Sequence, residues 1–199
     1  MSYSDFKTLD QVHKELGISI HDADGLYAHI PPAEVSQWFI ETMRMAYPKA
    51  VRINTESGRQ SLIVNHVLME LDRHVPVSFF LQNTFNVDAG KGLTGNPDGL
   101  ISKSENQLYI TAPVVMLVEA KKSDLGSGLA QCVAEMEAAR IFNEQEGNQV
   151  WPIYGVVTDG VLWQFLSLQK NTVTIDSCLY SFEDGRKIVG ILKSFICDV

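Results

Sequence analysis

The chain has 199 residues, of which 45% are hydrophobic and 20% charged, the balance of a globular protein that buries one core. Its longest apolar run, residues 112–118, is far shorter than the roughly 20 residues of a membrane span, and its first residues lack the basic start and apolar centre of a secretory signal, so we expect a cytoplasmic protein. The three cysteines are scattered, which argues against a disulfide framework, and the five histidines lack the spacing of a zinc enzyme. The net charge of −8 argues against binding of nucleic acid by bulk charge.

The N-terminal quarter of the chain predicts two helices. Thr8 begins a capping box that opens a short helix, and Gly17 ends this helix. An amphipathic helix follows over residues 33–47, up to the helix breaker Pro48. We therefore expect residues 1–54 to form a helical extension.

A third helix is predicted from Glu56 to about His74. Ile63 and Val67 lie on its apolar stripe, and Pro76 marks the end of the helix. This helix opens the region that we expect to be the core of the domain.

The middle of the chain changes to the composition of strands. Residues 77–87 are aromatic and β-branched, and a glycine-rich break separates them from a short strand at residues 100–104. Residues 108–119 are continuously apolar, which is typical of a strand covered on both faces. A helix bounded by Gly128 and Gly147 follows as a crossover connection.

The last part of the chain predicts two strands over residues 153–168, joined by a type I′ turn at Asp159-Gly160, and then a strand and a closing helix in residues 169–199. This order of elements predicts one α/β domain with a mixed β-sheet flanked by helices on both faces. Residues 55–168 would be its core.

The apolar strand that ends near residue 119 ends in charges. Residues two apart on a strand point to the same face, so Glu119 and Lys121 stand side by side, while Ala120 and Lys122 point away. Buried charges are costly unless they are paired or bind a metal, so this end is either a solvated ion pair or part of a site. Taken alone, the residues favour the solvated ion pair.

Asp98 lies in the turn-forming residues 96–99, where its side chain would bond its own backbone. If the two strands that follow are adjacent and antiparallel, however, Asp98 returns to the end of the strand that carries Glu119. Two carboxylates would then meet near Lys121, and converging carboxylate oxygens suit a divalent cation such as Mg²⁺.

Two further side chains are candidates for the same place. Glu56 begins the third helix and can point along the sheet edge, or it can simply be an acidic residue favoured at a helix N-terminus, and Glu70 is its rival. Gln131 lies in about the first turn of the crossover helix, where free N–H groups suit a phosphate, or it fills a gap. A solvated surface position is expected for four other cations: Lys91, Lys103, Lys122 and Arg140.

Pro97-Asp98, followed after twenty residues by Glu119-Ala120-Lys121, resembles the bipartite motif of the PD-(D/E)xK nuclease superfamily. That superfamily has the restriction-endonuclease-like fold, with an αβββαβ core. The resemblance therefore implies this fold for the present chain.

The resemblance is sharpest to the nuclease domain of type I restriction enzymes and their stand-alone relatives. In these proteins a helix that begins with Glu and Arg precedes the strands, as in residues 55–71, and a later hairpin is similar to residues 154–168. The resemblance covers residues 55–168. Related families often carry Gln followed four residues later by Tyr in the crossover helix, whereas Gln131 is followed by Glu135.

The resemblance implies hydrolysis of DNA phosphodiester bonds with Mg²⁺, with Mn²⁺ as a substitute and RNA left open as a substrate. The metal ligands would be Glu56, directly or through water, Asp98, Glu119 and the carbonyl of Ala120. Lys121 would orient and help to deprotonate the attacking water, and Gln131 is a further catalytic candidate. A metal that acidifies water needs no histidine or serine nucleophile.

The acidic net charge stands against a nuclease unless a local basic strip, a homodimer or a partner subunit supplies the affinity for DNA. The alternative is a nuclease-like domain without catalysis that serves in interaction or regulation. A third class, another carboxylate-based hydrolase, leaves Lys121 beside Glu119 unexplained.

Overall fold

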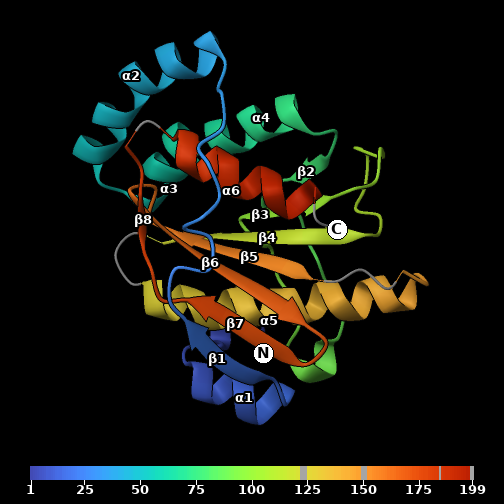
Figure 1. The fold of residues 1–199 in the computed structure, drawn as a ribbon. Coiled ribbons are helices and arrows are strands. Elements are labelled where there is room, and N and C mark those ends of the chain that lie inside the picture. The colour runs from blue at the N-terminus through green and yellow to red at the C-terminus, as the bar shows by residue number, and fades with distance from the viewer. Residues whose placement is uncertain (122–124, 149–151, 184, 198–199) are drawn as a thin grey trace.

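A mixed β-sheet forms the centre of the computed structural model, which describes residues 1–121, 125–148, 152–183 and 185–197. Figure 1 shows this sheet between layers of helices. The strand order is β1-β7-β6-β5-β4-β3-β2, with β8 paired to β6. The strands are β1 Ser19–Ala23, β2 Ser78–Phe80, β3 Gly99–Ser102, β4 Val114–Ala120, β5 Ile153–Thr158, β6 Leu162–Gln169, β7 Thr172–Asp176 and β8 Tyr180–Ser181.

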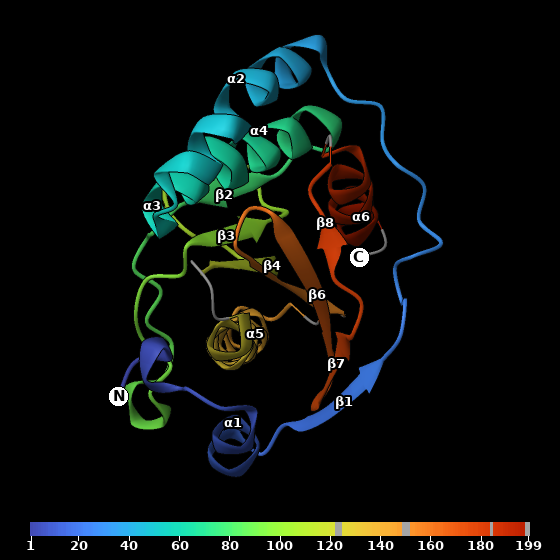
Figure 2. The same cartoon turned by 90° about the vertical axis from the view of Figure 1, so that its left-hand side faces the viewer.

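Helices cover both faces of the sheet, as the view down α5 in Figure 2 shows. The helices are α1 Leu9–Leu16, α2 Gln37–Ile53, α3 Glu56–Arg59, α4 Asn65–His74, α5 Leu125–Gln145 and α6 Arg186–Cys197. Leu117 and Leu166 pack with α1 and α5, whereas Met116 and Phe165 pack with α2, α4 and α6. This alternation of neighbouring residues gives the sheet one apolar core on each face. The predicted α/β class, with a mixed sheet and helices on both faces, is confirmed. Across the described ranges, every helix is too short or too polar to span a bilayer.

β4 lies between the antiparallel β3 and the parallel β5, and all seven of its residues are buried. The crossover that parallel neighbours require contains α5. Because Gly99 pairs with Val118, the start of β3 lies beside the end of β4. The chain thus brings residue 98 and residues 119–121 to one corner of the sheet.

The helix boundaries predicted near the N-terminus are confirmed, but the predicted capping box is incomplete, because Gln11 Oε1 accepts the N–H of Lys7 and not that of Thr8. Thr8 Oγ1 accepts a hydrogen bond from the Gln11 N–H at 3.2 Å, and Gly17, with a φ of 71°, ends α1. The helix predicted from Glu56 to His74 is also confirmed, as α3, a π-helical turn (Gln60–Val64) and α4.

The prediction that Pro48 ends the second helix is wrong, because α2 continues to Ile53. Pro48 is exposed on the outer side of α2, while Ala46 and Ala50 are buried on its inner side. Packing of that inner side outweighs the lost backbone hydrogen bond. The expectation of a purely helical extension is wrong as well, because β1 pairs in parallel with β7.

Two element boundaries and one turn type in the second half of the chain differ from prediction. The apolar strand begins at Val114, because residues 108–113 form a loop in which Leu108 is 92% exposed. Gly128 lies inside α5 and does not bound it. The turn at residues 159–160 is not type I′, because Gly160 has a positive φ but Asp159 does not. Asp159 Oδ1 accepts hydrogen bonds from the N–H groups of Val161 and Leu162.

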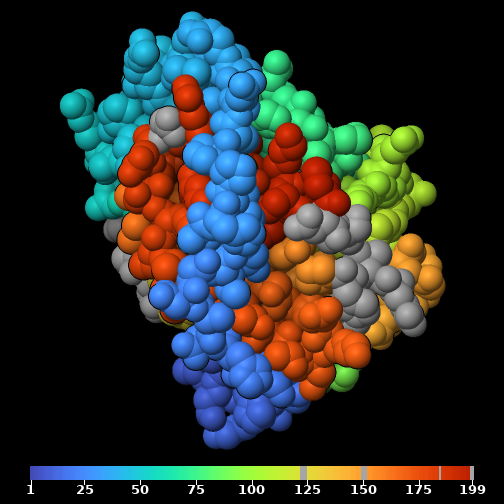
Figure 3. Space-filling view, viewed as in Figure 1, coloured from blue at the N-terminus to red at the C-terminus, as the bar shows by residue number. Residues whose placement is uncertain are grey.

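Residues 24–36, here called the strap, cross the molecular surface between β1 and α2. Figure 3 shows the strap as a blue band over the C-terminal strands and α6. Asp176 is fully buried and accepts hydrogen bonds from the N–H groups of Gly25 (2.9 Å) and Cys178 (3.0 Å) and from the hydroxyl of Tyr180 (2.8 Å). Lys187 donates to three carbonyl oxygens of the strap.

Replacing Asp176 with Ala should lower the free energy of unfolding by about 2–4 kcal/mol, because several part-buried donors lose their acceptor. Denaturant unfolding measures this loss. The control is Asp22→Ala, since Asp22 is exposed on β1. Equal losses in the two variants would contradict the role of Asp176 as the anchor of the strap.

Candidate active site

Asp98, Glu119 and Lys121 come together at the corner where β3 begins and β4 ends. Asp98 Oδ2 accepts a hydrogen bond from the Ala120 N–H at 2.9 Å. Lys121 Nζ forms an ion pair with Glu119 Oε1. Antiparallel pairing of β3 with β4 brings Asp98 to this point, as the sequence reasoning expected.

Lys121 links the strand to the crossover helix. Its Nζ donates to Gln131 Oε1 at 3.2 Å, and its backbone N–H donates to the Thr158 carbonyl at 2.7 Å. The Lys121 side chain is 21% exposed, whereas Glu119 is 1% exposed, so the lysine is the part of the ion pair that reaches solvent.

Gln131 lies in the second turn of α5, not in the first, because the helix begins at Leu125. From this position its side-chain amide oxygen accepts a hydrogen bond from Lys121, so Gln131 contacts the site directly. Residues 122–124 fall outside the described ranges, and so does the surface position expected for Lys122.

Glu135 is a buried member of the site that the sequence reasoning did not assign. Its Oε1 accepts a hydrogen bond from Gln131 Nε2 at 3.1 Å. The charge of Glu119 acts on this carboxyl group, and the Oε2 atoms of both residues are buried without a hydrogen-bond partner in the described structure. Two carboxylates cannot donate to each other, so a hydrogen bond between them would require a proton on one of them. The spacing of four residues after Gln131 was the signal for Glu135 in the sequence.

Burial sets the protonation of this cluster. Burial, reinforced by the charge of Asp98, raises the pKa of Glu119 to about 7, although Lys121 opposes the shift. Burial and the charge of Glu119 raise the pKa of Glu135 well above its usual range. Burial by itself would lower the pKa of Lys121, but the charge of Glu119, with smaller contributions from other carboxylates, outweighs it and raises the pKa.

Glu56 and Glu70, the rival acidic residues, have different places. Glu56 is exposed at the start of α3, and its charge contributes to the raised pKa of Lys121. Glu70 is buried and accepts hydrogen bonds from the N–H (2.6 Å) and hydroxyl (2.7 Å) of Ser36, the N-cap of α2. Glu70 is therefore committed to the start of α2 and is not available to the site.

No group of three His, Cys, Asp or Glu side chains in the described part of the chain is arranged to hold a metal ion. Glu56, Asp98 and Glu119 accordingly do not form a three-carboxylate cluster there. The acidic side chains that meet beside Lys121 are Asp98 and Glu119, with Glu135 behind them.

Two glutamines, which the sequence reasoning also missed, lie at the start of β3. Gln82 Nε2 donates to Gln60 Oε1 at 3.3 Å, and the Gln82 N–H approaches the Asp98 carbonyl at 3.4 Å. Gln82 has a φ of 53°, and Gln60 begins the π-helical turn. Such backbone irregularities often occur at functional sites, but neither can be read from the local sequence.

The helix that begins at Glu56 and the β5–β6 hairpin are joined by an ion pair. Arg59 Nη1 donates to Asp159 Oδ2 at 2.7 Å and to the Asp159 carbonyl at 3.1 Å. This pair holds α3 against the β5–β6 hairpin.

Two of the cations expected on the surface, Lys91 and Lys103, are exposed. Arg140 is not a simple surface residue, because it pairs with Glu137 and Glu144, each at 2.6 Å.

No protein-family model and no curated protein matches this sequence. The assignment of function therefore depends on the geometry of the site.

Gly128 leaves the space that Lys121 occupies. A Cβ atom at residue 128 would lie 2.7 Å from Val157 Cγ1 and 2.9 Å from Lys121 Cγ. Gly128→Ala should therefore displace Lys121 and destabilise the fold by about 1–3 kcal/mol, measured by denaturant unfolding. Gly126→Ala is the control, since Gly126 is exposed in the same helix. A Gly128→Ala protein as stable as the control would contradict this packing.

The unfolding free energy should fall as pH rises from about 4.5 to 7. Glu119 has an ordinary pKa of 4.5 in the unfolded chain and about 7 in the fold, so the folded state binds the proton more tightly in this window. The stabilisation is complete below pH 4.5 and lost above pH 7, with a size on the order of 3 kcal/mol. Glu119→Gln should make this slope shallower in measurements without divalent metal, while the raised pKa of Glu135 keeps part of it. An unchanged slope in Glu119→Gln would refute the assignment.

Proposed function

We propose that this protein is a metal-dependent nuclease that hydrolyses phosphodiester bonds of DNA in restriction, defence or repair. The observation that carries the proposal is the meeting of Asp98, Glu119 and Lys121 at one corner of the sheet, with the lysine open to solvent. The order of elements around it supports a restriction-endonuclease-like core: α3–α4, β2, β3, β4, α5 and β5.

The residues present fit a divalent cation. Glu119 Oε2 is buried without a protein donor, and the charge of the nearby Asp98 raises the pKa of Glu119. A cation would relieve both conditions, because it pairs with buried carboxylate oxygens. Asp98 and Glu119 would hold Mg²⁺ or Mn²⁺ together with the Ala120 carbonyl. Two protein carboxylates suffice for Mg²⁺, which keeps several waters as ligands.

When bound, the metal would lower the pKa of a water molecule and stabilise negative charge on the phosphate. Lys121 contributes the fixed positive charge of the protein. Its ammonium group, held between Glu119 and Gln131, is placed to orient the water and to pair with a phosphate oxygen. Glu135 holds the far side of the Gln131 amide and so fixes the direction of the amide oxygen.

A nuclease-like module without catalysis, serving in interaction or regulation, is the second candidate. One observation favours it: in the described residues no third acidic or imidazole side chain joins Asp98 and Glu119 as a metal ligand. In that case Lys121 would act as the structural counter-ion of Glu119.

Cleavage of supercoiled and linear DNA, with and without Mg²⁺ or Mn²⁺, tests the proposal. The wild-type protein should cleave only with metal. Lys121→Ala, Asp98→Ala and Asp98→Asn should each reduce the rate by at least about 100-fold, because each removes a charge from the reacting centre. Asp98→Asn is the sharpest variant, since an amide oxygen can still accept the Ala120 N–H.

Lys91→Ala is the control for the loss of a lysine, because Lys91 is exposed on a separate turn, Ala89–Lys91. It should cleave as the wild type does. Cleavage that survives substitution of both Asp98 and Lys121 would refute the mechanism. Failure of the folded wild type to cleave any DNA or RNA would favour the non-catalytic module.

A further inference from the structure

The outer face of α2 carries positive charge that the rest of the protein does not neutralise. Arg44, Lys49 and Arg52 are exposed, and none of them forms an ion pair with a described residue. Glu41 is the one carboxylate in the sequence of α2, so three cations face one acid along this helix. This local excess of two positive charges occurs in a chain whose net charge is −8.

Elsewhere in the described structure, several cations have acidic partners. Lys14 pairs with Asp10, Lys121 with Glu119, and Arg140 with both Glu137 and Glu144. Exposed lysines such as Lys91 and Lys170 also lack an ion pair with a described residue, but they are isolated in the chain, whereas Arg44, Lys49 and Arg52 lie within nine residues of one helix.

The basic face lies next to the candidate active site in the chain and in space. α2 ends at Ile53, and α3 begins three residues later at Glu56, whose charge acts on Lys121. Asn54, between the two helices, accepts a hydrogen bond from Arg59 at 3.0 Å. Figure 2 shows α2 and α3 together on one side of the sheet, above the end of α5.

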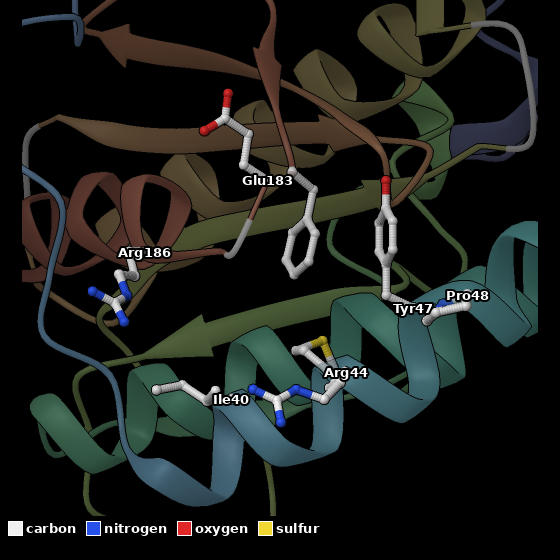
Figure 4. Close-up of a pocket in the computed structure, with 8 residues that line it drawn as sticks. Ile40, Arg44, Tyr47, Pro48, Glu183 and Arg186 are labelled. Carbon is white, nitrogen blue, oxygen red and sulfur yellow. The ribbon is translucent and has the colours of Figure 1, made fainter.

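A hollow of about 260 Å³ extends this surface from α2 towards the start of α6. Arg44 and Arg186 lie on its rim from opposite elements, and the carboxylate of Glu183 points away from Arg44 (Figure 4). Its wall includes the stacked rings of Tyr47 and Phe182, whose centroids are 5.1 Å apart. The positive surface thus borders a wall of stacked aromatic rings.

We propose that the outer face of α2, with Arg44, Lys49 and Arg52, binds the phosphate backbone of duplex DNA and leads it to the Asp98–Glu119–Lys121 site. The occupant is argued from charge: unpaired cations in an acidic protein complement a polyanion. The eight helical steps from Arg44 to Arg52 span about 12 Å, the axial rise of three to four base pairs. The proposal rests on the proposed function in that the bound DNA is the substrate of that site.

The test is DNA binding without catalysis, measured by fluorescence anisotropy of a labelled duplex in EDTA over a range of salt concentrations. The triple variant Arg44→Gln/Lys49→Gln/Arg52→Gln should bind on the order of 100-fold more weakly at 0.1 M salt. The slope of log K against log salt should become shallower by about 2–3, because up to three phosphate contacts are lost. Thermal unfolding should be close to that of the wild type, since all three side chains are exposed.

Lys170→Gln is the matched control, because Lys170 is an exposed cation in the turn between β6 and β7. It should leave affinity and salt slope unchanged. Three results would overturn the proposal: no binding of the wild type to duplex DNA, equal salt slopes in the triple variant and the wild type, or an equal loss in Lys170→Gln. An α2 face that instead bound a protein partner would give equal slopes. Binding in EDTA is independent of cleavage, so the proposed function and this surface can fail separately.

Discussion

The structure depends on one costly arrangement, a carboxylate at the end of the most buried strand. Glu119 is 1% exposed, and Asp98 and Glu135 add further acidic groups beside it. Lys121 compensates for part of this cost in the protein alone, and the raised pKa of Glu119 is consistent with a compensation that is incomplete. Strongly perturbed pKa values are common at functional sites, so we expect this carboxylate to have a function. A divalent cation is the partner that clustered carboxylate oxygens favour.

The elements around β4 are shaped to hold this cluster. Gly128 lets α5 approach Lys121 closely, and Gln131 and Glu135 then place their polar groups against the lysine and Glu119. On the opposite face, α2 and α3 are joined at Asn54 and present the basic surface above the same corner. The acidic net charge and the nucleic-acid function that we propose are thus reconciled by separation of charge over the surface.

The sequence predicted those features that depend on local pattern or on strand pairing. The α/β class, the helix from Glu56 to His74 and the meeting of Asp98 with Lys121 follow from apolar periodicity and the two-residue repeat of strands. Long-range packing decided the features that the sequence did not predict. Burial of its inner face lets α2 continue beyond Pro48. Pairing with β7 makes residues 19–23 a strand, β1, although their sequence pattern for a strand is weak. Glu135 was missed because an acidic residue in a helix is ordinarily assigned to solvent, and its burial follows from the position of α5 against the sheet.

The central claim is that Asp98 and Glu119 hold a divalent metal beside Lys121. Anomalous diffraction from crystals of this protein soaked in Mn²⁺ tests it most directly. The account predicts a manganese peak between the two carboxyl groups, and loss of that peak in Asp98→Asn, which retains an acceptor for the Ala120 N–H. A map without a peak at this corner, or with the same peak in the variant, would contradict the account.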